Sequence, residues 1–156
     1  MNNKMICMSL FTLALSGCLD AVNDDTPVAE TESALSGGPW TWDNSATLRC
    51  LDSDLAGSVY TLNCNNGSFQ RWTNTPLAFG DQVRDLATNY CLDSDFTGHA
   101  YTGVCNGGSF QQWVVRNTGT FGWEMRNVAT GLCLDSNTSG TVYTLGCNNG
   151  NFQRWR

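Results

Sequence analysis

The feature of this sequence that most constrains its fold is a threefold internal repeat. Each copy opens with Cys-Leu-Asp-Ser and closes with Gln-x-Trp, so the copies run over residues 50–72, 91–113 and 133–155. The first and third copies are identical at 17 of these 23 positions, and the opening cysteines are 41 and then 42 residues apart. A period of this length marks one supersecondary unit that must pack against its neighbours to bury its apolar face. The sequence therefore predicts one domain assembled from three equivalent units.

Each copy contains short β-prone runs separated by Gly, Asn, Ser and Thr, and no stretch of ten residues has a convincing helical period. In the third copy the predicted strands are residues 122–125, 132–135, 142–145 and 152–155, and four strands in each copy predict twelve in all. A propeller normally has at least four blades, and an open solenoid needs polar caps that these end copies lack. We therefore predict an all-β fold closed around a pseudo-threefold axis, which is the β-trefoil.

The six cysteines of the repeats predict disulfide bonds and an oxidising compartment. Threefold symmetry leaves two patterns, in which each copy either closes on itself or links to the next copy. We favour closure within a copy, because it lets each unit close independently and each loop of about 15 residues would contribute about 3 kcal/mol. No close Cys pair or Cys/His cluster suggests zinc, and we expect no metal and no cofactor. The favoured pairs are Cys50 with Cys64, Cys91 with Cys105, and Cys133 with Cys147.

A targeting segment precedes the repeats. An apolar run over residues 5–15 is too short to span a bilayer as a helix, so it indicates an export signal. The run ends in Leu-Ser-Gly-Cys, which resembles the lipobox of bacterial lipoproteins and implies cleavage before Cys18 and acylation of its thiol. The alternatives are an ordinary secretory cleavage nearby and an uncleaved anchor. We expect a signal peptide over 1–17, the lipidated Cys18 with an acidic flexible tether over 18–38, and the repeat domain over 39–156. This arrangement predicts an exported lipoprotein anchored to a bacterial membrane, in the periplasm or at the cell surface.

The charge of the chain excludes one class of partner. The formal net charge is -6, and residues 39–156 hold seven Arg against nine acidic residues. Nucleic-acid binding needs a basic surface that displaces counterions from phosphates, so we expect no nucleic-acid partner. The only histidine, His99, lies in a Thr-Gly-His-Ala loop, so the sequence offers few candidates for a catalytic nucleophile-base pair. We therefore expect no enzyme activity.

The string of motifs within each copy resembles the ricin B-type lectin family. Gln-x-Trp occurs three times with Cys-Leu-Asp upstream, and the first copy adds Val-Tyr-Thr-Leu at 59–62, Asn-Asn-Gly at 65–67 and Phe-Gln-Arg-Trp at 69–72. This finer pattern is similar to the repeat of actinohivin-like three-repeat lectins, which bind high-mannose glycans. The resemblance covers about residues 40–156. It implies a non-catalytic, multivalent carbohydrate-binding domain with up to three glycan sites.

The resemblance assigns four residues of each copy to a carbohydrate site. The Asp of Cys-Leu-Asp would accept hydrogen bonds from sugar hydroxyls, the Asn after the second Cys would donate and accept, and the Tyr would line the same pocket. The ring before Gln-x-Trp is Tyr in the actinohivin-like repeat and Phe here, so stacking survives and a hydroxyl contact does not. The predicted carbohydrate-binding residues are Asp52, Tyr60, Asn65 and Phe69; Asp93, Tyr101, Asn106 and Phe110; and Asp135, Tyr143, Asn148 and Phe152.

Structural roles compete with these assignments. The Trp and Gln of Gln-x-Trp are expected in the core and in bonds that hold the loop, and an Asn before Gly-rich sequence is a turn signal. The segment that starts at Asp52 imitates the first half of a calcium loop, but Asn63 stands where a bidentate Glu belongs. A glycosidase pair of Asp52 and Asp54 fails because both lie on one repeated open loop rather than in distinct environments.

Two alternatives to a lectin remain from other classes. One is a structural or protein-binding trefoil with inactive sugar pockets, and the other is the carbohydrate-targeting subunit of a separate hydrolase. For the favoured function we expect glycans or glycoconjugates as partners, contact with the lipid bilayer through Cys18, and a monomeric domain. We also expect copy two to be the weakest site, because Gly103 replaces the Leu of the other copies.

Overall fold

A computed structural model describes residues 37–156. The predictions for the signal peptide, for Cys18 and for the tether up to residue 36 lie outside the described residues. Within residues 37–156, no helix is long and apolar enough to cross a membrane.

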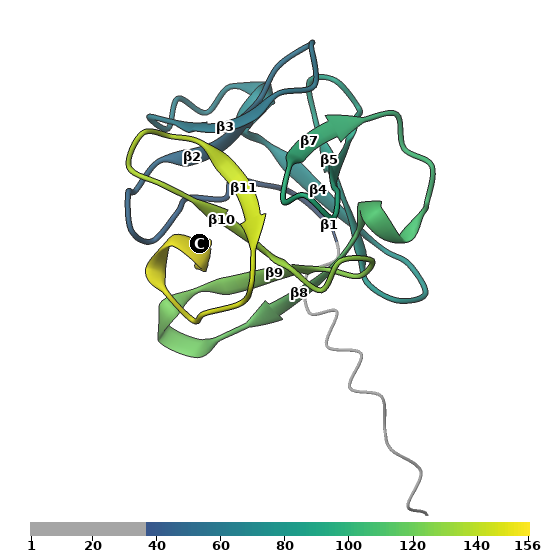
Figure 1. The fold of residues 1–156 in the computed structure, drawn as a ribbon. Coiled ribbons are helices and arrows are strands. Elements are labelled where there is room, and N and C mark those ends of the chain that lie inside the picture. The colour runs from purple at the N-terminus through teal and green to yellow at the C-terminus, as the bar shows by residue number, and fades with distance from the viewer. Residues whose placement is uncertain (1–36) are drawn as a thin grey trace, which may run out of the picture.

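The described chain is all-β, as predicted (Figure 1). Three hairpins carry the Cys-Leu-Asp-Ser segments: β2 (Cys50–Ser53) with β3 (Val59–Leu62), β6 (Cys91–Ser94) with β7 (Ala100–Gly103), and β10 (Cys133–Ser136) with β11 (Val142–Leu145). The other strands are β1 (Gly37–Trp40), β4 (Trp72–Pro76), β5 (Asp81–Asp85), β8 (Gln112–Asn117) and β9 (Trp123–Asn127). Short 3-10 turns are η1 (Ser68–Gln70), η2 (Ser109–Gln111), η3 (Gly119–Phe121) and η4 (Asn151–Gln153).

All strand pairs are antiparallel. The larger sheet contains, in spatial order, β1, β4, β5, β8, β9, β10 and β11, and β6 pairs with β5 and carries β7 on its other side. Among the described strands, β2 pairs only with β3. The predicted strand over 152–155 is wrong. Residues 151–153 form η4, whose amide groups bond within the turn, and only Trp155 pairs with its neighbours, through single bridges to Asn44 and Trp123.

The three hairpins close on one another around the pseudo-threefold axis. The amide of a Thr in each hairpin donates to the carbonyl of a Gly in another, with Thr61 to Gly140, Thr102 to Gly57 and Thr144 to Gly98, each at 2.8 Å. Gly140, Gly57 and Gly98 have φ of 94°, 89° and 88°, and a Cβ on any of them would lie within 2.8 Å of a Thr carbonyl oxygen. Glycine is therefore required at these three positions, because the backbones approach too closely for a side chain.

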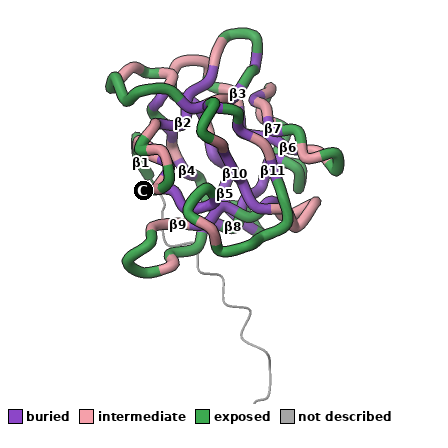
Figure 2. The backbone as a smooth tube through the Cα atoms, turned by 60° about the vertical axis from the view of Figure 1, so that its left-hand side comes forward, coloured by how far each residue is buried: buried purple, intermediate pink, exposed green. Residues whose placement is uncertain are grey.

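Threefold layers of apolar side chains fill the interior. Trp72, Trp113 and Trp155 are fully buried, and their indole Nε1 atoms donate to the carbonyls of Leu51, Leu92 and Leu134 at 2.9 to 3.1 Å. The tryptophans of Gln-x-Trp are thus core residues, as expected. Buried positions run along the strands and exposed ones along the loops (Figure 2).

The disulfide bonds join Cys50 to Cys64, Cys91 to Cys105, and Cys133 to Cys147. The favoured pattern, one bond within each copy, is confirmed. Each bond ties the first strand of a hairpin to the loop that carries the predicted Asn, so it fixes that loop beside the hairpin.

Candidate functional site

The predicted Asp and Tyr of each copy come together across a hairpin. Asp52 lies directly opposite Tyr60 on β2 and β3, and the same register pairs Asp93 with Tyr101 and Asp135 with Tyr143. Directly opposed residues point to the same face of a sheet, with Cβ atoms about 5 Å apart. The alternation of the strands therefore places the carboxylate beside the phenol ring in all three copies.

A glutamine holds the carboxylate and the loop in each copy. The Nε2 of Gln70 donates to Asp52 Oδ2 at 2.7 Å, and Gln70 Oε1 accepts the amide of Asn65 at 2.8 Å. Gln111 and Gln153 make the same two bonds in copies two and three, and all three glutamines are buried. The expectation that these glutamines hold the loop is confirmed. They also fix the orientation of the carboxylate, which the motif spacing did not reveal.

The three carboxylates are buried, and two of them are only partly satisfied. Asp52, Asp93 and Asp135 are 3–6% exposed. Within the described residues, Oδ1 of Asp93 and Oδ1 of Asp135 have no hydrogen-bond partner. A buried acceptor without a donor is costly, so a hydroxyl donor brought to either of these oxygens would be stabilising.

Burial also shifts the ionisation of the site. It raises the pKa of the Asp52 and Asp135 carboxyls above the ordinary 3.8, although the hydrogen bonds from Gln70 and Gln153 oppose the shift. Burial likewise raises the pKa of Tyr60, Tyr101 and Tyr143, and the nearby Asp carboxylate raises each of these pKa values further. Each Tyr is half-buried against its carboxylate, so a ligand must share the pocket with the ring.

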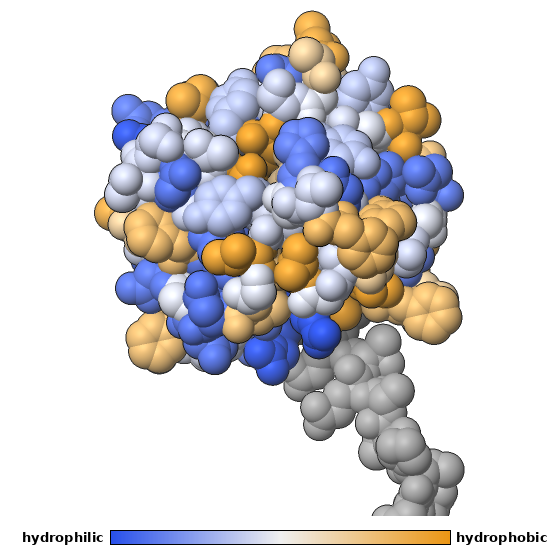
Figure 3. Space-filling view, viewed as in Figure 1, coloured by the Kyte–Doolittle hydropathy of each residue, from blue (hydrophilic) through white to orange (hydrophobic). Residues whose placement is uncertain are grey.

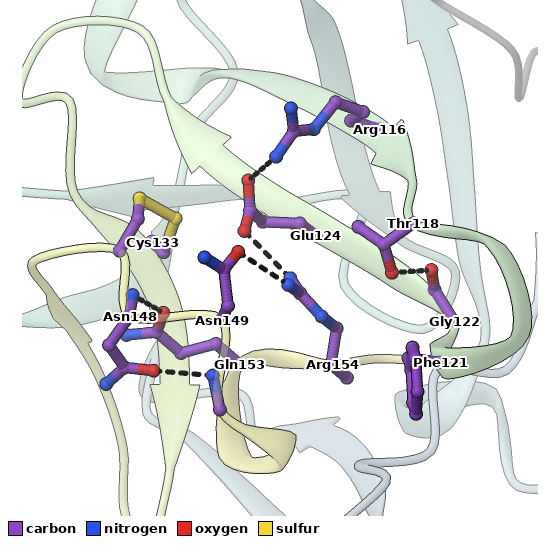
Figure 4. Close-up of polar contacts among 12 residues, drawn as sticks. Arg116, Thr118, Phe121, Gly122, Glu124, Cys133, Asn148, Asn149, Gln153 and Arg154 are labelled. Atoms are coloured by element: carbon purple, nitrogen blue, oxygen red, sulfur yellow. Dashed lines mark hydrogen bonds and ion pairs between the residues drawn. A yellow bond between two sulfur atoms is a disulfide. The ribbon is translucent and has the colours of Figure 1, made fainter.

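The predicted Asn of each copy has a turn role. Oδ1 of Asn65 accepts the amide of Gly67 at 2.7 Å, and Asn106 and Asn148 repeat this bond to Gly108 and Gly150. Figure 4 shows the third of these loops. All three asparagines are exposed, and within the described residues none of their Nδ2 groups donates a hydrogen bond. Nδ2 is therefore the atom of this residue that a ligand can use.

The aromatic surroundings differ between copies. Phe69 is half-buried, and Phe110 and Phe152 are each 37% exposed, next to their glutamines in the 3-10 turns. In copy two, Phe96 packs edge-on against Phe110 with ring centroids 5.3 Å apart, and His99 stacks on Tyr101 at 5.2 Å. Sequence reasoning missed Phe96 and the stacking of His99. The available signal was a large aromatic residue where the other copies have Leu55 and Thr138.

The loop between the paired strands is a self-contained turn. Oδ1 of Asp54 accepts the amides of Ala56 and Ser58, both at 2.9 Å, and these backbone bonds lower the pKa of Asp54. The carboxylate is thus already used by the turn, which agrees with the rejection of a calcium loop. In residues 37–156, Glu124, Cys133 and Cys147 form the one cluster with metal-ligand spacing, and both cysteines are in a disulfide bond.

The molecular surface offers shallow hollows. One of about 470 Å³ adjoins the candidate site of copy one and is lined in part by Leu62 and Asn65. On the face seen in Figure 3, apolar side chains lie singly or in small groups among hydrophilic ones. Shallow pockets rimmed by polar groups suit a hydroxyl-rich ligand better than an apolar one.

Three equivalent units around an axis, each with the same Asp, Tyr, Gln and Asn arrangement, define a β-trefoil of the carbohydrate-binding class. A model of the Ricin-type beta-trefoil lectin domain matches residues 41–155. The chain belongs to this family, whose domains bind carbohydrate and are generally non-catalytic.

Solved structures share this fold. The designed threefold-symmetric protein ThreeFoil is similar with a TM-score of 0.69 at 22% identity, over 74% of this chain and 94% of that chain. An exo-beta-1,3-galactanase from Clostridium thermocellum has a TM-score of 0.68 at 16% identity, over 78% of this chain and 30% of that chain. The hemolytic lectin CEL-III has a TM-score of 0.65 at 20% identity, again over 78% and 30%. The chain thus spans less than a third of the latter two proteins, and at these identities the likeness establishes the fold.

Proposed function

We propose that this protein is a multivalent lectin that binds mannose-type glycans at up to three sites and is tethered to a bacterial membrane. The observation that carries the proposal is the repetition of one polar constellation in all three copies. A scaffold needs only the core and the turns, yet each copy also keeps a buried carboxylate beside a Tyr and an exposed amide. The likeness of the repeats to those of actinohivin-like lectins supports mannose as the sugar.

The test replaces the three carboxylates with amides in one variant, Asp52→Asn, Asp93→Asn and Asp135→Asn. Asn keeps an oxygen that can accept the Gln Nε2 bond, so the fold is retained, but the charge that strengthens bonds from sugar hydroxyls is removed. On a glycan array that includes high-mannose structures, the wild type should bind and the triple variant should not. Full binding by a folded triple variant would reject this location for the sites.

A matched control uses the turn carboxylates of the same loops. Asp54→Asn and Asp95→Asn remove charges two residues away from the site, and copy three already has Asn137 at this position, where its Oδ1 accepts the amide of Ser139 at 3.0 Å. The control variant should therefore fold and bind like the wild type. Loss of binding in the control would show that net charge rather than the site controls the result.

Three sites related by an axis point in different directions, so one small glycan cannot occupy all of them. A glycan-dense surface can engage several sites, and weak monovalent binding should then become strong avidity. Single Asp→Asn variants should reduce binding to a mannan-coated surface stepwise, whereas binding of a monovalent mannoside should fall by about one site's share each time.

The membrane anchor is tested separately. If Cys18 is acylated, the wild type should partition into the detergent phase and the Cys18→Ser variant should not. Soluble or unprocessed wild-type protein would refute the anchor and leave the lectin proposal standing.

A second candidate role is carbohydrate targeting for a separate hydrolase, which the similarity to a segment of a galactanase favours. In that case the protein should co-purify with a glycoside hydrolase from its own cells and raise the rate of that enzyme on insoluble polysaccharide but not on a soluble oligosaccharide.

A further inference from the structure

Copy three, taken together with the β8–β9 hairpin that precedes it, carries a cluster of charged side chains that the proposed function does not use. Glu124 Oε2 accepts Arg154 Nη1 at 2.7 Å, and Glu124 Oε1 accepts Arg116 Nη2 at 3.0 Å (Figure 4). The Glu124 and Arg154 side chains are each 6% exposed, whereas the Arg116 side chain is 54% exposed. One end of this network is therefore buried, and the other reaches the surface.

A hollow of about 420 Å³ lies over this network. Arg116, Glu124, Arg126, Cys147 and Asn149 contribute to its walls. The exposed Arg126 donates from Nε to the carbonyl of Gly131 at 3.1 Å and forms no ion pair within residues 37–156. Its two Nη groups are thus available to a ligand, on a side chain that the backbone already steadies.

The local charge is opposite to that of the domain. Two arginines (116 and 126) and one glutamate line the hollow, and the buried Arg154 pairs with that glutamate, so these four residues together carry an excess of two positive charges. The domain as a whole has more acidic than basic residues. An arginine fork can donate two parallel hydrogen bonds to a carboxylate or a sulfate, so the hollow suits an oxyanion.

The fold does not require these charges. On β8 and β9, Arg116 lies opposite Glu124, whereas the equivalent pair on β4 and β5 is Thr75 opposite Gln82. The neutral pair forms the same antiparallel ladder. Because copy two folds with uncharged side chains at these two positions, the ladder does not require the charges of Arg116 and Glu124.

The hollow shares a loop with the candidate site of copy three. Arg154 Nη2 donates to Asn149 Oδ1 at 2.8 Å, and Asn149 follows Asn148, the predicted ligand-binding amide. Cys147 and Asn149 line the hollow, so the hollow adjoins the loop that carries Asn148. A glycan that contacts Asn148 therefore lies next to the loop that borders the arginines.

We propose that the site of copy three extends into this hollow and selects glycans with a carboxylate or sulfate on the sugar next to the one bound at Asp135. The inference rests on the proposed function, because the first sugar must be held by the lectin site. Copies one and two bind neutral glycans, and copy three adds recognition of an acidic substituent.

The experiment compares three versions of one mannose disaccharide, in which the second sugar is neutral, carries a carboxylate or carries a sulfate. Full-length protein in detergent is titrated by calorimetry at low salt and in 0.5 M NaCl. At low salt one site should bind the charged disaccharides about tenfold more tightly than the neutral one, and salt should reduce the ratio. Comparison of the carboxylated and sulfated forms shows which anion fits.

The variant Arg126→Gln removes one charge, and Arg84→Gln is its matched control, because Arg84 holds the same strand position in copy two. Arg126→Gln should abolish most of the preference for charged glycans and leave binding of the neutral disaccharide unchanged. Arg84→Gln should alter neither.

Equal affinities for charged and neutral disaccharides, or an equal loss of preference in both variants, would overturn the proposal. Free sulfate and acetate serve as further probes, observed through the Arg Nε–Hε signals by NMR. If they shift Arg126 as strongly as the charged disaccharides do, the hollow is an anion site independent of glycans, and the proposal is wrong. If neutral disaccharide does not bind at all, the proposed lectin function fails instead.

Discussion

One buried side chain differs in copy two where copies one and three agree, and it leads to a quantitative prediction. Six residues before the opening Cys, copies one and three have Asn44 and Asn127, whose Nδ2 groups donate to the carbonyls of Phe152 at 2.8 Å and Phe110 at 2.7 Å. Copy two has Asp85 at this position, fully buried. Its Oδ1 accepts two bonds from Thr88, but its Oδ2 has no partner within the described residues.

The substitution Asp85→Asn should stabilise the protein. Asn keeps the oxygen that Thr88 uses and supplies an N–H for the carbonyl of Phe69, which is the equivalent acceptor. Gaining a buried hydrogen bond and losing an unsatisfied carboxylate oxygen is worth about 2 kcal/mol. For a domain of this size that corresponds to a rise of about 8 °C in Tm.

The assay is thermal unfolding at pH 7, with Asn127→Asp as the reverse substitution. Asn127→Asp removes the bond to Phe110 and should lower Tm by a similar amount. If Asp85→Asn leaves Tm unchanged or lowers it while Asn127→Asp lowers it, the reasoning about Asp85 is refuted. Because Asp85 also contributes to the raised pKa of Asp52, Asp85→Asn should shift the acid limit of glycan binding at copy one to lower pH.

Three further predictions concern the sites and the disulfides. Glycan binding should weaken on acidification at a pH above 3.8, because burial raises the pKa of Asp52 and Asp135 and protonation removes the charge that strengthens the bonds they accept. In the same pH window, ionisation of these buried carboxyls lowers the stability of the fold as the pH rises, and titrations of binding and of unfolding check the two effects. Gly103→Leu should strengthen glycan binding at copy two roughly fivefold, because the added apolar contact is worth about 1 kcal/mol and a Cβ there meets only Gln111 Nε2 at 4.0 Å. NMR titration with a mannoside follows the three sites one by one, and tightest wild-type binding in copy two would contradict the predicted ranking. Replacing both Cys50 and Cys64 by Ser should lower the free energy of unfolding by about 3 kcal/mol in urea titrations.

The repeat predicted the architecture because three identical units can bury their apolar faces equally only by closing on one another. The spacing of the cysteines allowed two pairings, and symmetry with loop length favoured the one that the structure has. The site residues Asp, Tyr and Asn were predicted from the resemblance to ricin B-type lectins, and the register of each hairpin then places the Asp directly opposite the Tyr. The strand over 152–155 was wrong because β-propensity does not register the 3-10 turn at η4.

The remaining features depend on groups that are distant in sequence. Gln70 reaches Asp52 only because the disulfide-closed loop folds back over the hairpin, and no local pattern encodes which oxygen it leaves free. The ion network of Glu124 joins β8 and β9 to Arg154, which is 30 residues further along the chain, so no local pattern in the sequence reveals it. By itself, the sequence determined the threefold closure, since this follows from periodicity, and its resemblance to ricin B-type lectins supplied the residue types proposed for each pocket. The tertiary structure alone decided which polar atoms are satisfied and which are left for a ligand, because satisfaction is a property of three-dimensional neighbours.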